Sequence, residues 1–107
     1  MKRFPVDFDA CMADDDLAMY YELRLCMLAG YRGHVCSDEV DLHHMIRKGW
    51  SEPELIAVVC HTANVGRLAD EKEARRTLVQ MKVQQHGEDR MRAVLANRGL
   101  SLDSFLD

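Results

Sequence analysis

The sequence has no long apolar run. Its 107 residues are 48% hydrophobic and 30% charged, and no apolar stretch approaches the roughly 20 residues that a helix needs to cross a bilayer. The N-terminal stretch MKRFPVDFDACMADDD begins with basic residues but lacks the apolar segment of a secretory signal. We therefore predict a single cytoplasmic domain that spans residues 1–107 and has no membrane partner.

A concentration of positive charge is also absent. The net charge is -4; residues 1–66 carry 11 acidic and 6 basic side chains, and residues 67–107 carry 7 and 8. Neither part has the basic surface typical of nucleic-acid binding, so we predict no nucleic-acid partner. Basic and acidic residues alternate over 67–76, which predicts a solvated helix face with i,i+4 ion pairs; the residues are Arg67, Asp70, Glu71, Lys72, Glu73, Arg75 and Arg76.

Paired cysteine motifs are missing as well. The four cysteines, Cys11, Cys26, Cys36 and Cys60, form no C-x-x-C motif, and their irregular spacing argues against a disulfide framework. Cys26 and Cys60 lie in apolar runs and are predicted to be buried and inert. Cys36 follows His34 at an expected helix N-terminus, where it is either a reactive thiolate or a small buried residue.

Signals for β-strands are weak, whereas helical periods with capping residues dominate. We predict helices over 17–31, 38–48, 51–65, 68–86 and 88–97. Ser51 and Glu54 resemble a capping box at the start of the third helix, with Pro53 in its first turn. The apolar residues of the tail 100–106 predict one further docked turn. The expected fold is all-α, a bundle of five to six helices.

Possible metal ligands occur without a diagnostic spacing. The candidates are His34, Cys36, Asp41, His43, His44, Cys60 and His61. On a helix over 38–48, the adjacent His43 and His44 would point about 100° apart and could not easily share one ion. No H-x-x-x-H or E-x-x-H spacing links the candidates. The sequence therefore predicts neither a metal site nor a cofactor.

One segment has a recognisable pattern. Glu22, Gly33, the stretch GWSEPEL from Gly49 and the stretch VCHTANVG from Val59 follow one another in residues 22–66. This register resembles the carboxymuconolactone decarboxylase and alkylhydroperoxidase D-like family. The resemblance implies a helical homo-oligomer, usually a homotrimer or homohexamer. The E-x11-C-x2-C-x3-H motif of the peroxidase branch falls on His34, Ser37 and Asp41, so a C-x-x-C peroxidase is excluded.

The resemblance also implies a site. In the family fold, Glu22 would approach His34 and Asp41, with Cys36, His44 and His61 as further candidate catalytic residues. Two carboxylates beside an imidazole suit proton transfer, so the predicted function is decarboxylation or isomerisation of a small carbonyl or lactone compound.

Two alternatives remain open. The chain could be a non-catalytic oligomerisation or binding module, in which the polar cluster only holds helices in register. It could also be a single-thiol redox enzyme that uses Cys36 with His34 as its activating base.

Overall fold

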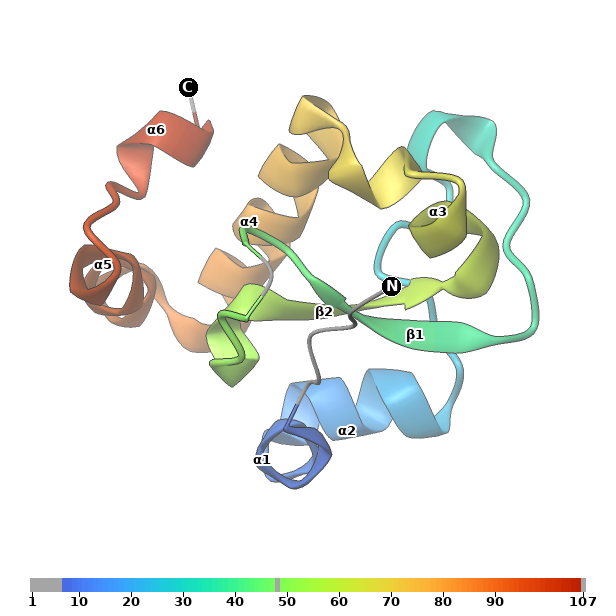
Figure 1. The fold of residues 1–107 in the computed structure, drawn as a ribbon, viewed down its shortest axis with the longest axis horizontal. Coiled ribbons are helices and arrows are strands. Elements are labelled where there is room, and N and C mark those ends of the chain that lie inside the picture. Colours follow the sequence, from blue (N-terminus) through green and yellow to red (C-terminus); the bar gives the residue numbers. More distant parts are fainter. Residues whose placement is uncertain (1–6, 48, 107) are drawn as a thin grey trace.

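The computed structural model of the protein describes residues 7–47 and 49–106. The basic start of the chain, used above in the prediction about a signal segment, and Lys48 lie outside these residues. The elements in chain order are α1 Phe8–Met12, α2 Asp15–Glu22, η1 Tyr31–Gly33, β1 Val40–His44, η2 Pro53–Leu55, β2 Ile56–Cys60, α3 His61–Val65, η3 Leu68–Asp70, α4 Lys72–His86, α5 Glu88–Asn97 and α6 Asp103–Leu106 (Figure 1).

The prediction of an all-α bundle is wrong, because β1 and β2 form a two-stranded antiparallel sheet. Val40 pairs with Cys60 and His44 with Ile56. The segment expected as a helix over 38–48 contains β1, in which apolar and polar residues alternate from Val40 to His43. The segment expected as a helix over 51–65 contains β2, whose run IAVVC is rich in β-branched residues.

The helix start expected at Ser51 fails for a visible reason. Glu54 does not reach back as part of a capping box; its buried carboxylate accepts a hydrogen bond from Arg90 Nε at 3.1 Å. Pro53 begins only the short 3-10 turn η2. A tertiary ion pair therefore replaces the local interaction that the sequence suggests.

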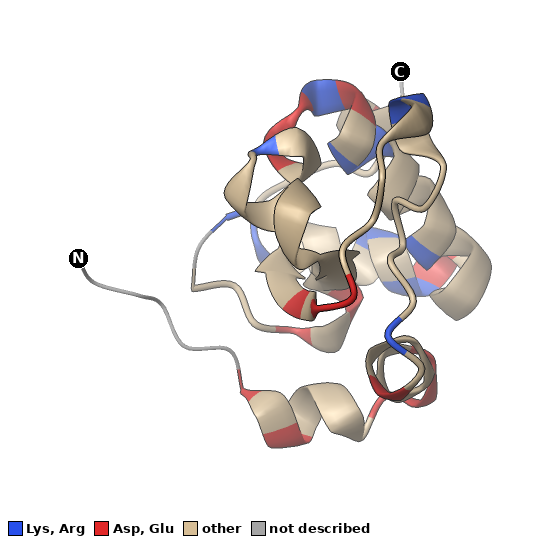
Figure 2. Ribbon diagram, turned by 90° about the vertical axis from the view of Figure 1, so that its right-hand side faces the viewer, with Lys and Arg blue, Asp and Glu red and all other residues tan. Residues whose placement is uncertain are grey.

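The sheet lies in the middle of the molecule. Helices α1 and α2 lie on one side of it and α4 on the other, in both views (Figures 1 and 2). All five residues of β2 are buried, and Leu17, Val58 and Leu78 belong to the same core. The hairpin is thus enclosed by helices, which fixes the position of the residues at its open end.

The remaining helical predictions fare better. Asp14 caps α2, since its Oδ1 accepts a hydrogen bond from the Leu17 backbone N–H at 3.1 Å, but α2 ends at Glu22 rather than near 31. The helix expected over 68–86 divides into η3 and α4, and α5 spans the predicted range. The tail forms α6, with Leu102 buried and Phe105 packed against the core.

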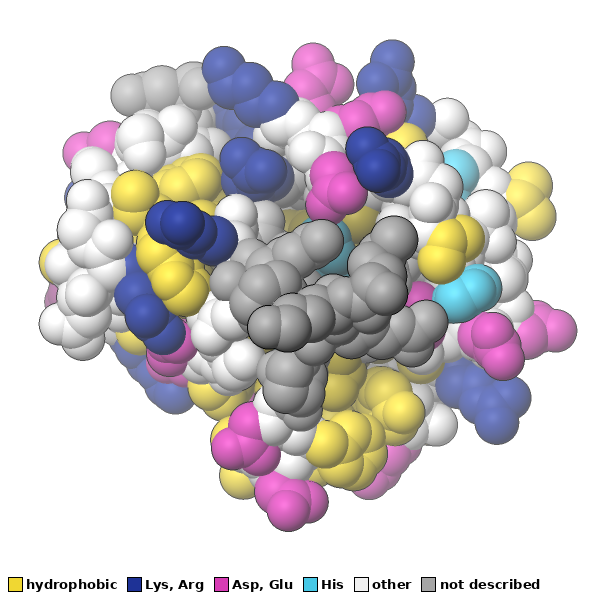
Figure 3. Space-filling view, viewed as in Figure 1, with side chains coloured by type: hydrophobic (Ala, Val, Ile, Leu, Met, Phe, Trp, Pro, Cys, Tyr) yellow, Lys and Arg dark blue, Asp and Glu magenta, His cyan; other side chains and the backbone are white. Residues whose placement is uncertain are grey.

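None of the helices in the described ranges is both long and apolar enough to cross a bilayer. Exposed apolar side chains gather at the lower edge of Figure 3, over α1 and α2. Phe8 in α1, Met19 in α2 and Leu23 just after α2 are exposed. Met81 and Val83 are partly buried against the core. The expected homo-oligomer stays a prediction.

Candidate metal centre and histidine–aspartate site

The imidazole of His34 lies among three cysteine sulfurs. Its Nε2 is 3.2 Å from Sγ of Cys36, 3.6 Å from Sγ of Cys60 and 4.0 Å from Sγ of Cys26. All four of these ligand atoms lie within 4.8 Å of one another. Four soft or borderline ligand atoms from distant parts of the chain therefore converge on one point.

Backbone contacts to the sheet bring the cluster together. Cys60 is the last residue of β2. The Met27 backbone N–H donates to the Val58 carbonyl at 2.8 Å, which places the segment that carries Cys26 beside this strand. The chain then turns through η1, where Gly30 and Gly33 adopt φ values of 79° and 69° that favour glycine. That turn returns His34 and Cys36 to the end of β2.

The position of His34 suits a shared metal ion better than hydrogen bonds to the three thiols. Its Nδ1 lies 3.0 Å from the Tyr31 carbonyl oxygen, so Nδ1 carries the proton and donates it, and the lone pair of Nε2 faces the sulfurs. One lone pair can accept only one S–H bond, yet three sulfurs surround it. Zn–S and Zn–N distances of about 2.3 Å and 2.0–2.1 Å in a tetrahedron place nitrogen about 3.6 Å from each sulfur. The observed distances scatter around this value.

The thiols differ in acidity. Burial raises the pKa of Cys60, but hydrogen bonds from the Ala63 and Ser37 backbone outweigh it and lower this pKa to about 6. In one of these bonds, the Ala63 backbone N–H donates to Sγ of Cys60 at 3.4 Å, so Cys60 is the N-cap of α3. Burial raises the pKa of Cys26 to about 12 and also raises that of Cys36. Without a cation, only some of the three thiols can lose their protons. A divalent metal would compensate the negative charge of several thiolates.

A second polar group lies immediately after Cys60. His61 Nδ1 donates to Oδ2 of Asp41 at 2.8 Å, and the side-chain amide of Asn64 donates to the same oxygen at 2.9 Å. The side chain of His61 is 47% exposed and that of Asp41 is 29% exposed. Because Nδ1 carries the proton, the other ring nitrogen of His61 can accept one from water or from a bound molecule.

The buried residue His43 is connected to this polar group through Asn64. The Nδ1 atom of His43 donates to the amide oxygen of Asn64 at 3.2 Å, and its Nε2 lies 3.8 Å from a carboxylate oxygen of Asp70. Burial lowers the pKa of His43, and the Asp70 carboxylate opposes part of that change. His43 is therefore a neutral imidazole at neutral pH that is joined to the His61–Asp41 pair through Asn64.

The residues predicted from sequence divide between these two groups. His34 and Cys36 belong to the metal cluster, while Asp41 and His61 form the histidine–aspartate pair. Glu22 is exposed at the end of α2 and makes no hydrogen bond or ion pair to any described residue. His44 lies at the end of β1 opposite Ile56, on the other face of the strand from Asp41. The expected Glu22–His34–Asp41 cluster is not formed.

The sequence does not reveal two functional candidates, namely Cys26, which it predicts to be inert, and Asn64. For Cys60 it leaves two interpretations open, a buried inert thiol and a possible metal ligand. Although no C-x-x-C motif pairs Cys36 with another thiol in the sequence, Cys26 and Cys60 are its neighbours in the structure. One sequence feature could have revealed the cluster. His34 and Cys36 lie shortly before one strand, and Cys60 lies at the end of the next. The start of one strand and the end of the next meet in space when the two strands are antiparallel.

Comparison with known proteins adds no assignment. No protein-family model, no curated protein and no solved structure matches this chain. The resemblance to the carboxymuconolactone decarboxylase and alkylhydroperoxidase D-like family is therefore neither supported nor opposed by a relative, although the all-helical fold it implied is not the one observed. The function must be inferred from the two side-chain groups.

Proposed function

We propose that the protein is a zinc-binding domain in which Cys26, His34, Cys36 and Cys60 hold one ion. The observation that carries this proposal is the position of His34 Nε2, between 3.2 and 4.0 Å from all three sulfurs. Three thiolates and an imidazole suit zinc, whereas magnesium and calcium prefer oxygen ligands. With four protein ligands the site is closed, so the ion serves the fold rather than the chemistry.

The ion would join two parts of the chain that are far apart in sequence. Cys26, His34 and Cys36 lie in or beside the turn around η1, and Cys60 lies at the junction of β2 and α3. The Tyr31 carbonyl that accepts from His34 Nδ1 fixes the ring and its tautomer, a role that such outer contacts commonly have in zinc sites. The zinc centre thereby positions His61, the residue that follows Cys60.

A metal titration tests the proposal. Reduced apoprotein is titrated with Co²⁺, which reports tetrahedral thiolate ligation through intense visible bands and a sulfur-to-metal charge-transfer band, and zinc is then added to displace it. We expect one ion per chain. Cys36→Ser should lose the charge-transfer intensity of one thiolate and most of the affinity, and Cys11→Ala, a change at a buried cysteine outside the cluster, should leave both unchanged.

The competing chemistry for three adjacent thiols is a disulfide. Two of Cys26, Cys36 and Cys60 would then pair and the third would remain a thiol. Mass spectrometry under denaturing, non-reducing conditions counts the alkylatable thiols, and metal analysis of the native protein counts the bound ions. Four thiols and one ion per chain support the proposal, whereas a mass two hydrogens lower with no metal contradicts it.

A second function is favoured by the His61–Asp41 pair, namely proton-transfer catalysis. The proton-transfer chemistry expected from sequence is retained here with a different set of residues, since Asp41 orients His61 and Glu22 takes no part. With Nδ1–H held by Asp41, His61 can act as a general base on a bound carbonyl or lactone compound or on a water molecule. The exposure of its ring leaves the reacting nitrogen accessible.

Paired variants test the catalytic proposal. Zinc-loaded protein is screened against lactones, esters and phosphate esters, and any turnover is remeasured in His61→Ala, Asp41→Asn and Cys11→Ala. We expect turnover to be lost in His61→Ala and to fall by about 10²–10⁴-fold in Asp41→Asn. Turnover in Cys11→Ala should be unchanged. Turnover that survives His61→Ala would contradict the proposal.

A further inference from the structure

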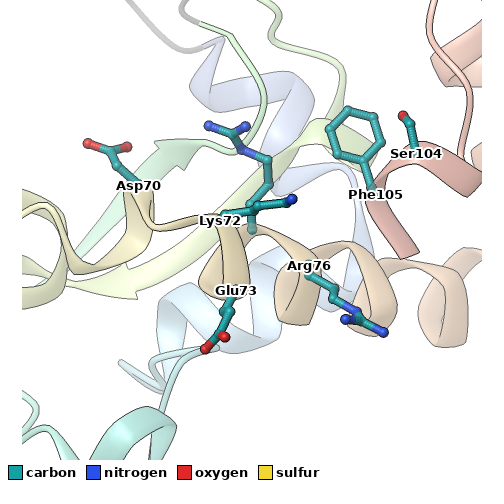
Figure 4. A pocket seen from close by; sticks show the side chains of 7 residues that line it. Asp70, Lys72, Glu73, Arg76, Ser104 and Phe105 are labelled. Carbon is teal, nitrogen blue, oxygen red and sulfur yellow. The ribbon is translucent and has the colours of Figure 1, made fainter. Parts of the chain in front are cut away.

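A pocket of about 450 Å³ opens between the N-terminal turns of α4 and the final helix α6. Basic side chains line it, namely Lys72, Arg75 and Arg76, together with Phe105 and the carboxylates of Asp70 and Glu73. Its volume is in the range of sites that hold small organic ligands. In Figure 4, Lys72 extends toward Phe105, whereas Asp70 and Glu73 point away from the space between those two side chains.

The three basic side chains of this pocket have no acidic partner among the described residues. Elsewhere Arg32, Arg90, Arg92 and Arg98 each pair with a carboxylate. Within the described ranges Lys72, Arg75 and Arg76 form no ion pair, so the i,i+4 pairs expected from sequence are absent; Glu71 instead accepts from Arg32 at 2.9 Å and from Tyr31 at 3.2 Å. Moreover, Nε of Arg75 is buried and has no hydrogen-bond partner.

The N-terminal end of α4 adds to the positive electrostatic potential of the pocket. The helix has 15 residues, and its N-cap residue Glu71 provides no side-chain hydrogen bond, so the backbone N–H groups of its first turn stay open. The aligned peptide dipoles make this end of the helix electropositive. Among the described residues, Arg75 thus offers a buried donor without a partner, and Lys72 and Arg76 are cations without an ion pair beside that helix end. Such an arrangement stabilises a compact anion.

We propose that this pocket binds a phosphate monoester whose flat organic group lies against Phe105. The phosphate would accept hydrogen bonds from the Arg75 guanidinium, which matches its geometry, and from Lys72. The aromatic ring of Phe105 provides a surface for a planar ring system. The site is separate from the zinc cluster and does not depend on the proposed proton transfer, although Asp70 lies both at the pocket and beside His43.

Calorimetric titrations of zinc-loaded protein test this proposal with AMP, inorganic phosphate and adenosine as probes. We expect AMP to bind more tightly than phosphate and adenosine not to bind. Arg75→Gln and Lys72→Gln should each weaken AMP and phosphate binding by about tenfold or more, because each removes a charge-assisted hydrogen bond. Phe105→Ala should weaken AMP binding only.

Arg24→Gln is the matched control, because Arg24 is an exposed arginine without an ion pair in the described ranges and is not among the pocket residues. It should bind AMP as the unchanged protein does. The proposal fails if neither AMP nor phosphate binds, if adenosine binds as well as AMP, or if Arg24→Gln weakens binding as much as Arg75→Gln. Since Lys72 is exposed, its variant also keeps the test valid if Arg75→Gln does not fold.

Discussion

Nε2 of His34 lies 3.6 Å from Sγ of Cys60, although 26 residues separate the two in the chain. Between them lie the whole of β1, the turn that follows it and β2. A metal bound to both residues would therefore close a long loop around the hairpin. The predictions below follow from this connection and from the polar groups around it.

Removal of zinc should lower the free energy of unfolding. A ligand that binds only the folded chain stabilises it by about 4 kcal/mol when its concentration is 1,000 times its dissociation constant. We therefore expect a loss of at least this order when urea unfolding is measured with excess chelator instead of excess zinc, under reducing conditions. Equal unfolding midpoints in the two buffers would show that the cluster holds no stabilising ion.

Zinc affinity should fall as the solution becomes more acidic. The Tyr31 carbonyl raises the pKa of His34 above 6.5, and the pKa of Cys60 is about 6. Metal binding requires both groups without their protons, so protons compete with zinc increasingly as the pH falls through this range. The zinc dissociation constant, measured by competition with a chelator, should rise by more than about tenfold between about pH 7.5 and 5.5. An affinity independent of pH would exclude these ligands.

Asn64→Ala should destabilise the hairpin more than a neighbouring surface change does. The amide of Asn64 donates to Asp41 and accepts from the buried His43, and its removal leaves the N–H of His43 without a partner. The expected cost is about 1–3 kcal/mol in the free energy of unfolding. Thr62→Ala, at an exposed position of the same helix, should change it by less than about 0.5 kcal/mol. Equal effects would contradict the network.

Lys82→Met should stabilise the protein at neutral pH. Lys82 is fully buried and donates to the Pro53 carbonyl at 3.1 Å, and burial lowers its pKa from 10.5 to about 8. Below about pH 8 both the folded and the unfolded chain carry this charge, and the folded state bears the full cost of burying it. Replacement of such a charge by an apolar side chain should add about 1–3 kcal/mol to the free energy of unfolding.

The pH dependence provides the check on that variant. Between about pH 8 and 10.5 the unfolded chain holds a proton at Lys82 that the folded chain has lost, so the unchanged protein gains stability as the pH rises. The advantage of Lys82→Met should therefore shrink over this window and vanish above it. A variant less stable than the unchanged protein at pH 7 would show that the nearby acids Asp14 and Glu54 outweigh the burial cost.

The helices that the sequence predicts well are those whose limits depend on local residues. Glycine at Gly87 and Gly99 brackets α5, and Asp14 caps α2 through its own side chain. The hairpin was missed because Ser37, Gly49 and Ser51 resemble helix signals, while the alternation in β1 acquires meaning only once β2 pairs with it. Strand pairing is a long-range interaction, and local propensity is a weak guide to it.

The site was mislocated for the same reason. On a helix over 38–48, Asp41 and His44 share a face, whereas on a strand they point to opposite faces. Cys26 and Cys60 lie in apolar surroundings that are typical of inert thiols, and only the return of the chain through η1 shows that they meet. Ligands separated by an entire hairpin carry no fixed sequence spacing, so their convergence could be found only from the fold.

The most direct test of the zinc centre is X-ray absorption at the zinc edge on protein purified under reducing conditions. The extended fine structure reports the number, kind and distance of the atoms bound to the metal. We expect one zinc per chain with three sulfurs at about 2.3 Å and one nitrogen at about 2.0–2.1 Å. A metal-free protein, or zinc surrounded only by oxygen and nitrogen, would contradict the proposed role of Cys26, His34, Cys36 and Cys60.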